Sequence, residues 1–536
     1  MIKIELYDTT LRDGMQGEGM SLSAHEKVRV AHALDELGLD LIEAGFPSSN
    51  PKELELFELL ARERFEHAQV AAFGMTRRRD VKAQDDPALQ VLADCFAPVC
   101  TLVGKTWSLH LEKVVKVDRA ENLRMVAESI AFLVGSGKRV IYDAEHFFDA
   151  FADDREYSLA CVRAAAQAGA ETITICDTNG GTLPGAIAEA AAVVVQELGP
   201  TGVRIGIHCH DDAGCAVAGT LAAVAAGATH VQGTQNGYGE RCGNANLTTV
   251  IPNLQLKAGF ECVTAQQLEA LTTSSHFFDE LLNFTPNHNQ PYVGRNAFAH
   301  KGGLHVAGVA ADPSTFEHIA PEVVGNDRAV LVSELSGKGT IHARAAEAGI
   351  ELDDAAATRL IERVKEREHE GYHYEAADGS FELLMRKEGG EYTPLFTLES
   401  WRVIVEKRAD GRVQTEATIK IWSPPPEGER YVFTAEGTGP VGALDRALRG
   451  ALASVYPELD TIKLVNFKVR ILDGAKASDA ITRVLLDSSN GEQEWGAIGV
   501  SDNVIEASWE ALVDSLELGM QAGHRPGRAD EARTSS

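Results

Sequence analysis

His208 and His210 form the residue pair in this sequence best suited to bind a metal ion. They end the run from Ile205 to His210, which predicts a β-strand, and side chains two positions apart on a strand point to the same face. Both imidazoles can therefore ligate one ion. Asp13 and Asn244 each follow another predicted strand, and they offer a carboxylate and an amide oxygen as further ligands. This donor set suits Mn²⁺, Mg²⁺ or Zn²⁺ and leaves positions open for a bidentate substrate.

Three more polar residues lie where predicted strands end. Arg12 precedes Asp13, where a fixed guanidinium can bind a carbonyl oxygen that becomes an alkoxide, although an isolated Arg-Asp pair is more often a surface ion pair. The carboxylate of Glu145 suits either proton transfer or a supporting ion pair, and the spacing leaves both open. The hydroxyl of Thr178 can bind a substrate carboxylate.

An α/β fold has to position these residues. Short β-branched runs recur between residues 3 and 240, and each is followed by a stretch of helical period. Ser23, for example, is expected to cap a helix that Gly38 closes. Eight such units predict a (β/α)₈ TIM barrel whose active site lies at the carboxyl ends of the strands. The expected strands are residues 4–8, 41–46, 70–74, 100–103, 140–144, 172–176, 205–210 and 230–234.

The second half of the chain shows two other sequence patterns. A mainly helical linker region follows the barrel, and alternating runs such as TEATIKIW then predict a C-terminal α+β domain. The final segment, HRPGRADEARTSS, has the composition of a disordered tail. The expected division is residues 1–275 for the barrel, 276–390 for the linker, 391–523 for the C-terminal domain and 524–536 for the tail.

Composition narrows the classes of function. The net charge of −29, from 50 Lys and Arg against 79 Asp and Glu, disfavours nucleic acid as a partner. No apolar run is long enough to span a bilayer, and the N-terminus lacks the regions of a signal peptide. Eight cysteines without a Cys-x-x-Cys pair fit a reducing compartment, so we expect a cytoplasmic protein.

Five motifs occur in an order and spacing that resemble the 2-isopropylmalate, homocitrate and citramalate synthases of the DRE-TIM metallolyase superfamily. They are DTTLRDGMQ, GFPSSNP, DTNG, HCHDDAG and GYGERCGNANL. Within that superfamily the chain is most similar to the citramalate synthases, through GKTWSLHL, YDAEHFFD, FAHKGGLHVAGV, VLVSELSGK, FKVRILDG and EASWEALVDS. The resemblance therefore extends over nearly the whole chain.

The resemblance implies an acyltransferase that converts the acyl group into an alkyl group. Acetyl-CoA would condense with pyruvate to give (R)-citramalate and CoA, in isoleucine biosynthesis. Asp13, His208, His210 and Asn244 would ligate a divalent metal, and Arg12, Glu145 and His305 would be catalytic. Arg12, Thr178 and Gln16 would bind substrate.

The resemblance also implies a domain-swapped homodimer. His305 and the linker would complete the partner's active site, and the C-terminal domain would bind a regulatory amino acid, expected to be isoleucine. Two positions depart from many relatives. Met15 stands where they have a glutamate, and Ala307, two positions after His305, stands where they have the aspartate of a His-x-Asp sequence. Neither a carboxylate role at position 15 nor a two-residue relay at His305 is therefore carried over.

Two other functions remain open from the sequence. The same chemistry could act on a larger 2-oxo acid, as in the 2-isopropylmalate and homocitrate synthases, because one or two methyl groups change selectivity by only ~1 to 3 kcal/mol each. A catalytically inert amino-acid-binding regulator is the alternative of another class. The intact set of Arg12, Asp13, His208 and His210 argues against an inert protein.

Overall fold

The structure of the protein is a computed structural model that describes residues 2–47, 50–330, 337–374, 377–425, 428–472, 480–491 and 493–522. The chain divides into two compact units. The first unit holds residues 1–298 and 319–328, and the second holds residues 299–318 and 329–536. The expected tail at 524–536, and most of the VLVSELSGK motif, lie outside the described residues.

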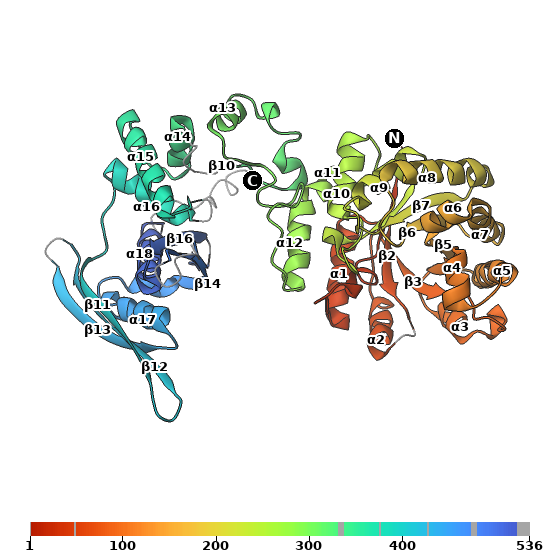
Figure 1. The fold of residues 1–536 in the computed structure, drawn as a ribbon, viewed down its shortest axis with the longest axis horizontal. Helices are drawn as coiled ribbons and strands as arrows, with labels where there is room; N and C mark the ends of the chain where they lie inside the picture. Colours follow the sequence, from red (N-terminus) through yellow and green to blue (C-terminus); the bar gives the residue numbers. More distant parts are fainter. Residues whose placement is uncertain are drawn as a thin grey trace, which may run out of the picture. The chain divides into compact units, whose positions relative to one another are not determined.

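Eight parallel strands form a closed barrel in the first unit (Figure 1). Each strand pairs with the next one along the chain, and the last strand closes on the first with Gln232 opposite Tyr7. The predicted TIM barrel is confirmed, so the carboxyl ends of all eight strands meet at one rim. The strands are β1 (Glu5–Asp8), β2 (Leu41–Gly45), β3 (Gln69–Met75), β4 (Val99–Lys105), β5 (Arg139–Glu145), β6 (Thr172–Asp177), β7 (Arg204–Cys209) and β8 (His230–Gly233).

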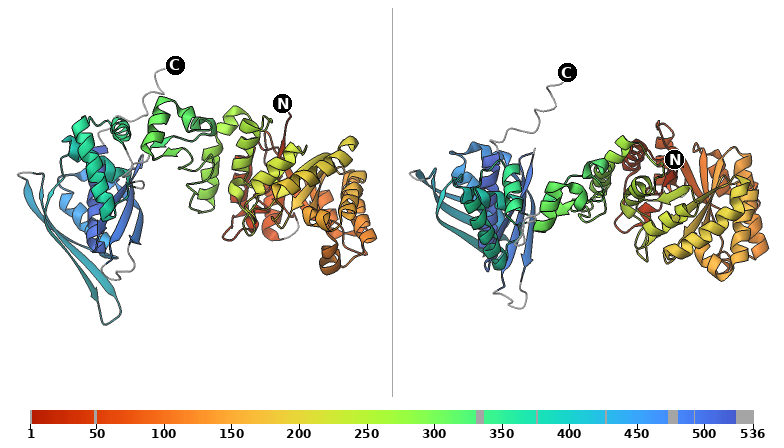
Figure 2. Two further views of the ribbon diagram at one scale, coloured as in Figure 1. Left: turned by 45° about the horizontal axis from the view of Figure 1, so that its top comes forward. Right: turned by 90° about the horizontal axis from the view of Figure 1, so that it is seen from above.

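Helices surround the barrel and cover the outer faces of its strands (Figure 2). Ser23 caps the first helix in a capping box with Glu26, and Gly38 follows its end at φ +84°, as the sequence predicts. Strands β2 and β6 are buried at every position because helices cover one face and the barrel interior the other. The helices are α1 (Ala24–Glu36), α2 (Pro51–Leu60), α3 (Pro87–Asp94), α4 (Ser108–His110), α5 (Arg119–Gly135), α6 (Phe147–Asp153), α7 (Arg155–Gln167), α8 (Pro184–Leu198), α9 (Ala216–Ala225), α10 (Leu247–Pro252), α11 (Ala265–Glu269) and α12 (Leu271–Leu281).

The second unit begins with a short parallel strand pair and four helices. Three of these helices share a core that includes Leu360 and Phe381. The elements are β9 (Ala299–His300), β10 (Ala329–Val330), α13 (Gly303–Ala311), α14 (Lys338–Glu347), α15 (Asp354–Glu370) and α16 (Asp378–Gly389). The predicted boundary at 275/276 falls within α12, and the predicted domain limits stay a prediction.

Two antiparallel three-stranded sheets follow, each with one helix packed on it, which confirms the predicted C-terminal α+β domain. The alternation in TEATIKIW buries Ala417, Ile419 and Ile421 against Leu444 and Leu448 of the first of these helices. The first set is β11 (Thr397–Lys407), β12 (Val413–Ser423), β13 (Glu429–Gly437) and α17 (Pro440–Leu452). The second is β14 (Lys463–Ile471), β15 (Thr482–Ser489), β16 (Glu494–Ser501) and α18 (Val504–Ala522).

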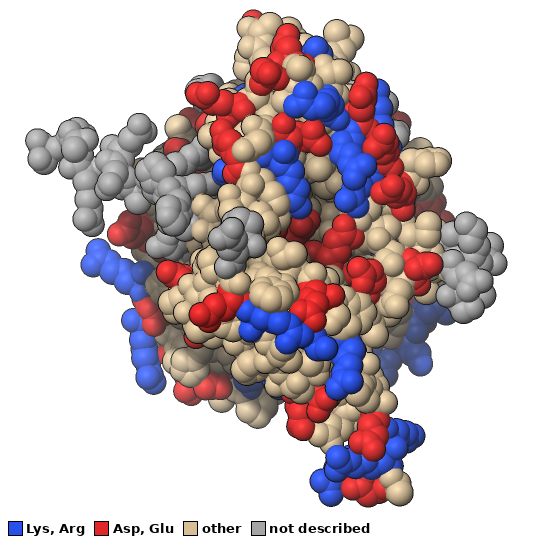
Figure 3. All heavy atoms as spheres, turned by 90° about the vertical axis from the view of Figure 1, so that its left-hand side faces the viewer, with Lys and Arg blue, Asp and Glu red and all other residues tan. Residues whose placement is uncertain are grey.

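The surface shows how the acidic charge is distributed. On the face drawn in Figure 3, Lys and Arg side chains are interspersed with Asp and Glu side chains. The excess negative charge therefore does not gather there as one acidic patch. Among the described residues, no helix combines the length and the apolar character that crossing a membrane requires.

Candidate active site

Asp13, His208 and His210 converge at the carboxyl rim of the barrel. His208 lies in β7, His210 directly follows that strand, and Asp13 lies in the turn after β1. The two Nε2 atoms are 3.3 Å apart, and Asp13 Oδ2 lies 3.3 Å from Nε2 of His208 and 3.7 Å from Nε2 of His210. All three residues are buried, and one donor atom from each lies within 4.8 Å of the others. This geometry can hold a metal ion.

Unpartnered polar atoms test whether a cation fits this cluster. Asn244 pairs with His210 in an isolated β-bridge, and its Nδ2 donates to the carbonyl of Tyr238 at 3.0 Å. Asn244 Oδ1 and Asp13 Oδ1 are buried without a hydrogen-bond partner. Buried oxygens of this kind are costly unless something pairs with them. Two imidazoles, a carboxylate and an amide oxygen are donors that divalent cations accept, so the residues fit a metal.

Gln232, in β8, orients the first of these imidazoles. Its Oε1 accepts a hydrogen bond from Nδ1 of His208 at 3.0 Å, which leaves Nε2 of that ring as the lone-pair atom in the cluster. The Gln232 amide nitrogen donates to Asp143 Oδ1 at 3.0 Å and to Thr174 Oγ1 at 3.1 Å. Three strands therefore fix the tautomer and the ring plane of His208. Sequence reasoning missed Gln232, whose only signal is an amide inside the buried run HVQG.

Electrostatics put two of the groups in the protonation state that metal binding needs. Burial alone would raise the pKa of Asp13, but Arg12 and His208 hold it well below its usual range. Burial and the neighbouring His208 lower the pKa of His210 to about 4. Asp13 is therefore a carboxylate and His210 a neutral imidazole near pH 7, and both forms bind cations.

Arg12 is held beside the cluster by a carboxylate that the sequence analysis did not assign. Arg12 Nε lies 2.5 Å from Glu43 Oε2, and its Nη1 lies 3.4 Å from Asp13 Oδ2. The guanidinium carbon stacks 4.0 Å from the centre of the Phe73 ring. The hydroxyl of Tyr7 donates to Glu43 Oε1 at 2.7 Å. The signal in the sequence was a glutamate inside the otherwise apolar strand LIEAG.

Glu145 ends β5 and forms an ion pair with Lys105, which ends the neighbouring strand β4. The hydroxyl of Thr106 donates to the backbone carbonyl of Glu145. The structure thus contains the supporting ion pair that the spacing had left open. A role in proton transfer stays a prediction.

The remaining predicted residues lie in three different settings. Thr178 Oγ1 accepts a hydrogen bond from the backbone N–H of His146 at 2.9 Å, which leaves its own proton available to a ligand. Gln16 is exposed in the short 3₁₀ turn Gly14–Gln16 directly after Asp13. His305 lies in α13 of the second unit, where its ring stacks on Phe316 with centroids 4.1 Å apart. The cluster of the first unit is formed without His305, and the roles of all three residues stay predictions.

A closed eight-strand barrel with a buried Asp/His/His cluster at its carboxyl rim defines a barrel enzyme with a candidate metal site. Three family models match the chain in succession. The HMGL-like model matches residues 3–276, the homocitrate synthase post-HMGL domain-like model 292–371, and the LeuA allosteric (dimerisation) domain 375–520.

Full-length relatives match as well. The chain is 49% identical to an (R)-citramalate synthase of Streptomyces coelicolor and 46% identical to one of Synechocystis, covering 97% and 96% of each chain. An HMG-CoA lyase structure from Acenitobacter baumannii matches 54% of this chain and 94% of its own, with 19% identity and a TM-score of 0.45. The chain belongs to the HMGL-like family and, over 97% of its length, to the family of these (R)-citramalate synthases. The resemblance found in the sequence is confirmed.

Proposed function

We propose that the protein condenses acetyl-CoA with pyruvate and hydrolyses the thioester, giving (R)-citramalate and CoA for isoleucine biosynthesis. The observation that carries the proposal is the convergence of Asp13, His208 and His210 beside Arg12 at the barrel rim. The choice of pyruvate over a larger 2-oxo acid is supported by the full-length similarity to (R)-citramalate synthases.

The proposed ligands of a divalent cation, Mn²⁺, Mg²⁺ or Zn²⁺, are Asp13, His208, His210 and Asn244. A cation there would polarise the ketone of pyruvate and so make its carbon a better electrophile. Arg12 is the second electrophilic group. Its guanidinium is held by Glu43 and would donate to the ketone oxygen as negative charge develops on it. Because that pair is buried, the donor needs no rearrangement during the reaction.

The hydroxyl of Thr178 and the amide of Gln16 would orient the substrate, and the ion pair of Glu145 would support proton transfer. Thr178, with its hydroxyl proton uncommitted, would donate to the pyruvate carboxylate. Gln16 lies one helical turn beyond Asp13 and would contact the same substrate. Glu145, paired with Lys105, would support the proton transfer at the acetyl group.

The chemistry divides into two steps. A base removes a proton from the acetyl methyl group, the resulting enolate carbon forms a bond to the ketone carbon, and the ketone oxygen takes up a proton. Water then adds to the thioester carbonyl, and CoA leaves as the thiol. We propose that His305 of a partner subunit assists the first proton transfer, which requires a domain-swapped homodimer.

The C-terminal domain is the proposed regulatory part. A match to the LeuA allosteric (dimerisation) domain over residues 375–520 supports both dimerisation and control by a ligand, for which we propose isoleucine. We also propose the division at 275/276 and 390/391 and a cytoplasmic location.

The test is release of CoA thiol from acetyl-CoA by the full-length protein with Mn²⁺, with four 2-oxo acids offered in parallel. We expect preference for pyruvate over 2-oxobutyrate, 2-oxoisovalerate and 2-oxoglutarate. Preference for 2-oxoisovalerate or 2-oxoglutarate would assign the chain a sister activity. Absence of release with all four would refute the proposed function.

A further inference from the structure

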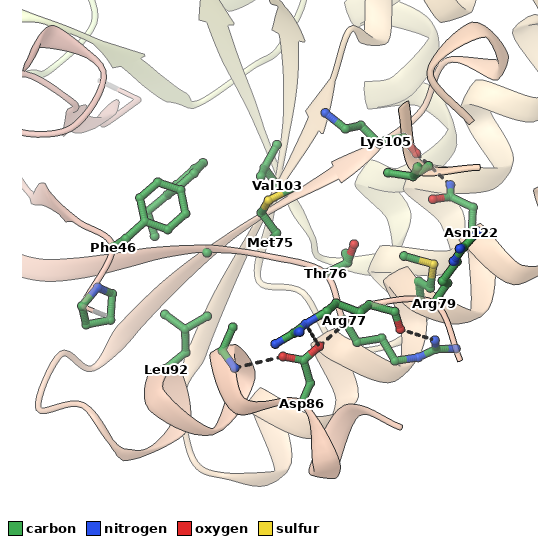
Figure 4. Close-up of a pocket in the computed structure, with 17 residues that line it drawn as sticks. Phe46, Met75, Thr76, Arg77, Arg79, Asp86, Leu92, Val103, Lys105 and Asn122 are labelled. Carbon is green, nitrogen blue, oxygen red and sulfur yellow. Dashed lines mark hydrogen bonds and ion pairs between the residues drawn. The ribbon is translucent and has the colours of Figure 1, made fainter. Parts of the chain in front are cut away.

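A cavity of about 470 Å³ lies beside the candidate active site, at the carboxyl ends of β2, β3 and β4. Its walls are mainly apolar and include Phe46, Met75, Leu92, Val103 and Met125. Figure 4 shows Phe46 and Leu92 on one side of this side cavity and Arg77 and Arg79 on the other. The volume is in the range of small-molecule sites, which are typically ~300 to 1,000 Å³.

The side cavity is lined by the contact partners of two proposed catalytic groups. Phe73, in its wall, is the ring on which the Arg12 guanidinium stacks. Lys105, also in its wall, is the ion-pair partner of Glu145. Among the described residues that line it, none is a proposed metal ligand. A ligand in the side cavity would therefore contact the partners of Arg12 and Glu145 without occupying the metal position.

The rim of the side cavity carries three consecutive arginines, and their contacts differ. Arg77 is only 5% exposed and is fixed by Glu121 at 2.8 Å and Glu128 at 2.6 Å. Arg78 and Arg79 are exposed. Their charges are therefore the ones that a ligand from solution can meet.

The two exposed guanidiniums make weak contacts within the protein. Arg78 Nε lies 3.8 Å from Asp86 Oδ2. Arg79 donates to the backbone carbonyl of Lys116 at 3.3 Å, and no carboxylate of the described chain pairs with it. Two exposed guanidiniums therefore lie at the rim of an apolar cavity. Arginine forks bind phosphate oxygens in paired, charge-assisted hydrogen bonds.

We infer that the side cavity binds the pantetheine arm of the acyl-CoA substrate and that Arg78 and Arg79 bind its phosphate groups. The inference rests on the proposed function, because that function supplies a ligand with both an uncharged arm and phosphates. It assigns the thioester to the β2–β4 side of the rim, so that its acetyl group approaches Glu145 and Arg12 from there. The metal cluster remains available to the 2-oxo acid.

The test compares the double variant R78A/R79A with the wild type and with R412A. Arg412 is a matched control, because its side chain is 82% exposed and lies in the second unit. The Kd of CoA alone is measured by calorimetry on the purified full-length protein. It should rise about 10- to 100-fold in R78A/R79A and stay unchanged in R412A. The KM for acetyl-CoA should rise by a similar factor, with the KM for pyruvate unchanged.

A second substrate separates phosphate binding from the apolar arm. Acetyl-pantetheine carries the thioester and the arm without phosphates, so R78A/R79A should turn it over as the wild type does. Met75→Asp places a charge at a wall residue that is 47% exposed, and it should impair turnover of both thioesters without lowering Tm.

Several outcomes would overturn the inference. Unchanged CoA affinity in R78A/R79A would show that Arg78 and Arg79 do not bind the phosphates. An equal loss of turnover with acetyl-CoA and acetyl-pantetheine would show a general defect of the variant and would also contradict the inference. Normal turnover of both thioesters by Met75→Asp would exclude the side cavity. Failure of the proposed function is distinguishable, since the wild type would then bind CoA in calorimetry yet release no thiol with any 2-oxo acid.

Discussion

Replacing Glu43 by glutamine should impair catalysis much more than folding. The wild-type carboxylate holds Arg12 Nε at 2.5 Å and accepts from the hydroxyl of Tyr7 at 2.7 Å, and both Glu43 and Tyr7 are fully buried. Glutamine has the same shape but no charge. Its amide can keep only one of these two acceptor positions, so the guanidinium of Arg12 loses a fixed partner.

The expected magnitudes follow from the burial. A hydrogen bond to a charged group contributes about 1.5 to 3 kcal/mol, so we expect Glu43→Gln to lose about 2 kcal/mol of stability. Displacement of a catalytic group by about 1 Å lowers the rate about 100-fold. We therefore expect kcat to fall about 100-fold, equivalent to about 2.7 kcal/mol, while the KM for pyruvate changes less.

Glu53→Gln is the matched control for this variant. Glu53 forms a similarly close ion pair with Lys27 between α2 and α1, in which Arg12 takes no part. Thiol-release kinetics and thermal unfolding should show a comparable loss of stability in both variants but a loss of kcat only in Glu43→Gln. If folded Glu43→Gln kept more than half of the wild-type kcat, the idea that Glu43 positions Arg12 would be wrong.

Three further predictions concern the metal and the pH. EDTA should abolish thiol release, and Mn²⁺ should restore it in the wild type but not in His208→Ala; restored activity in that variant would count against the proposed ligand set. Gln232→Leu should weaken metal binding about 10- to 100-fold, measured by titration with Mn²⁺, because the His208 ring loses its acceptor; unchanged affinity would contradict this. Burial acts to raise the pKa of Glu5, but its bonds to His230 and Arg204 lower it from 4.5 to about 2. A depressed carboxylate pKa contributes stability above pH 4.5 that is lost as the pH falls towards 2, so urea unfolding should show Glu5→Gln less stable by about 3 kcal/mol at pH 7, with a gap that shrinks below pH 4.5. A gap independent of pH would refute the assigned pKa.

The order of the residues along the chain determined the fold class and most of the candidate site. Eight β-branched runs with helical stretches between them predicted the barrel, because each helix has to bury its apolar face against the strands. Once the strands were placed, period-two alternation put His208 and His210 on one face. Arg12, Asp13 and Asn244 followed because strand ends in a parallel barrel meet at one rim.

Tertiary structure decided the partners of these residues. Glu43 binds Arg12 across 31 positions, Gln232 orients His208 across 24, and Lys105 pairs with Glu145 across 40. Sequence periodicity fixes which face a side chain is on, but contacts across the barrel interior depend on the stagger of neighbouring strands and on side-chain rotamers. The side cavity likewise exists only where three strand ends meet α3 and α5. Local pattern therefore determined the donors of the site, and long-range packing determined what holds each donor in place.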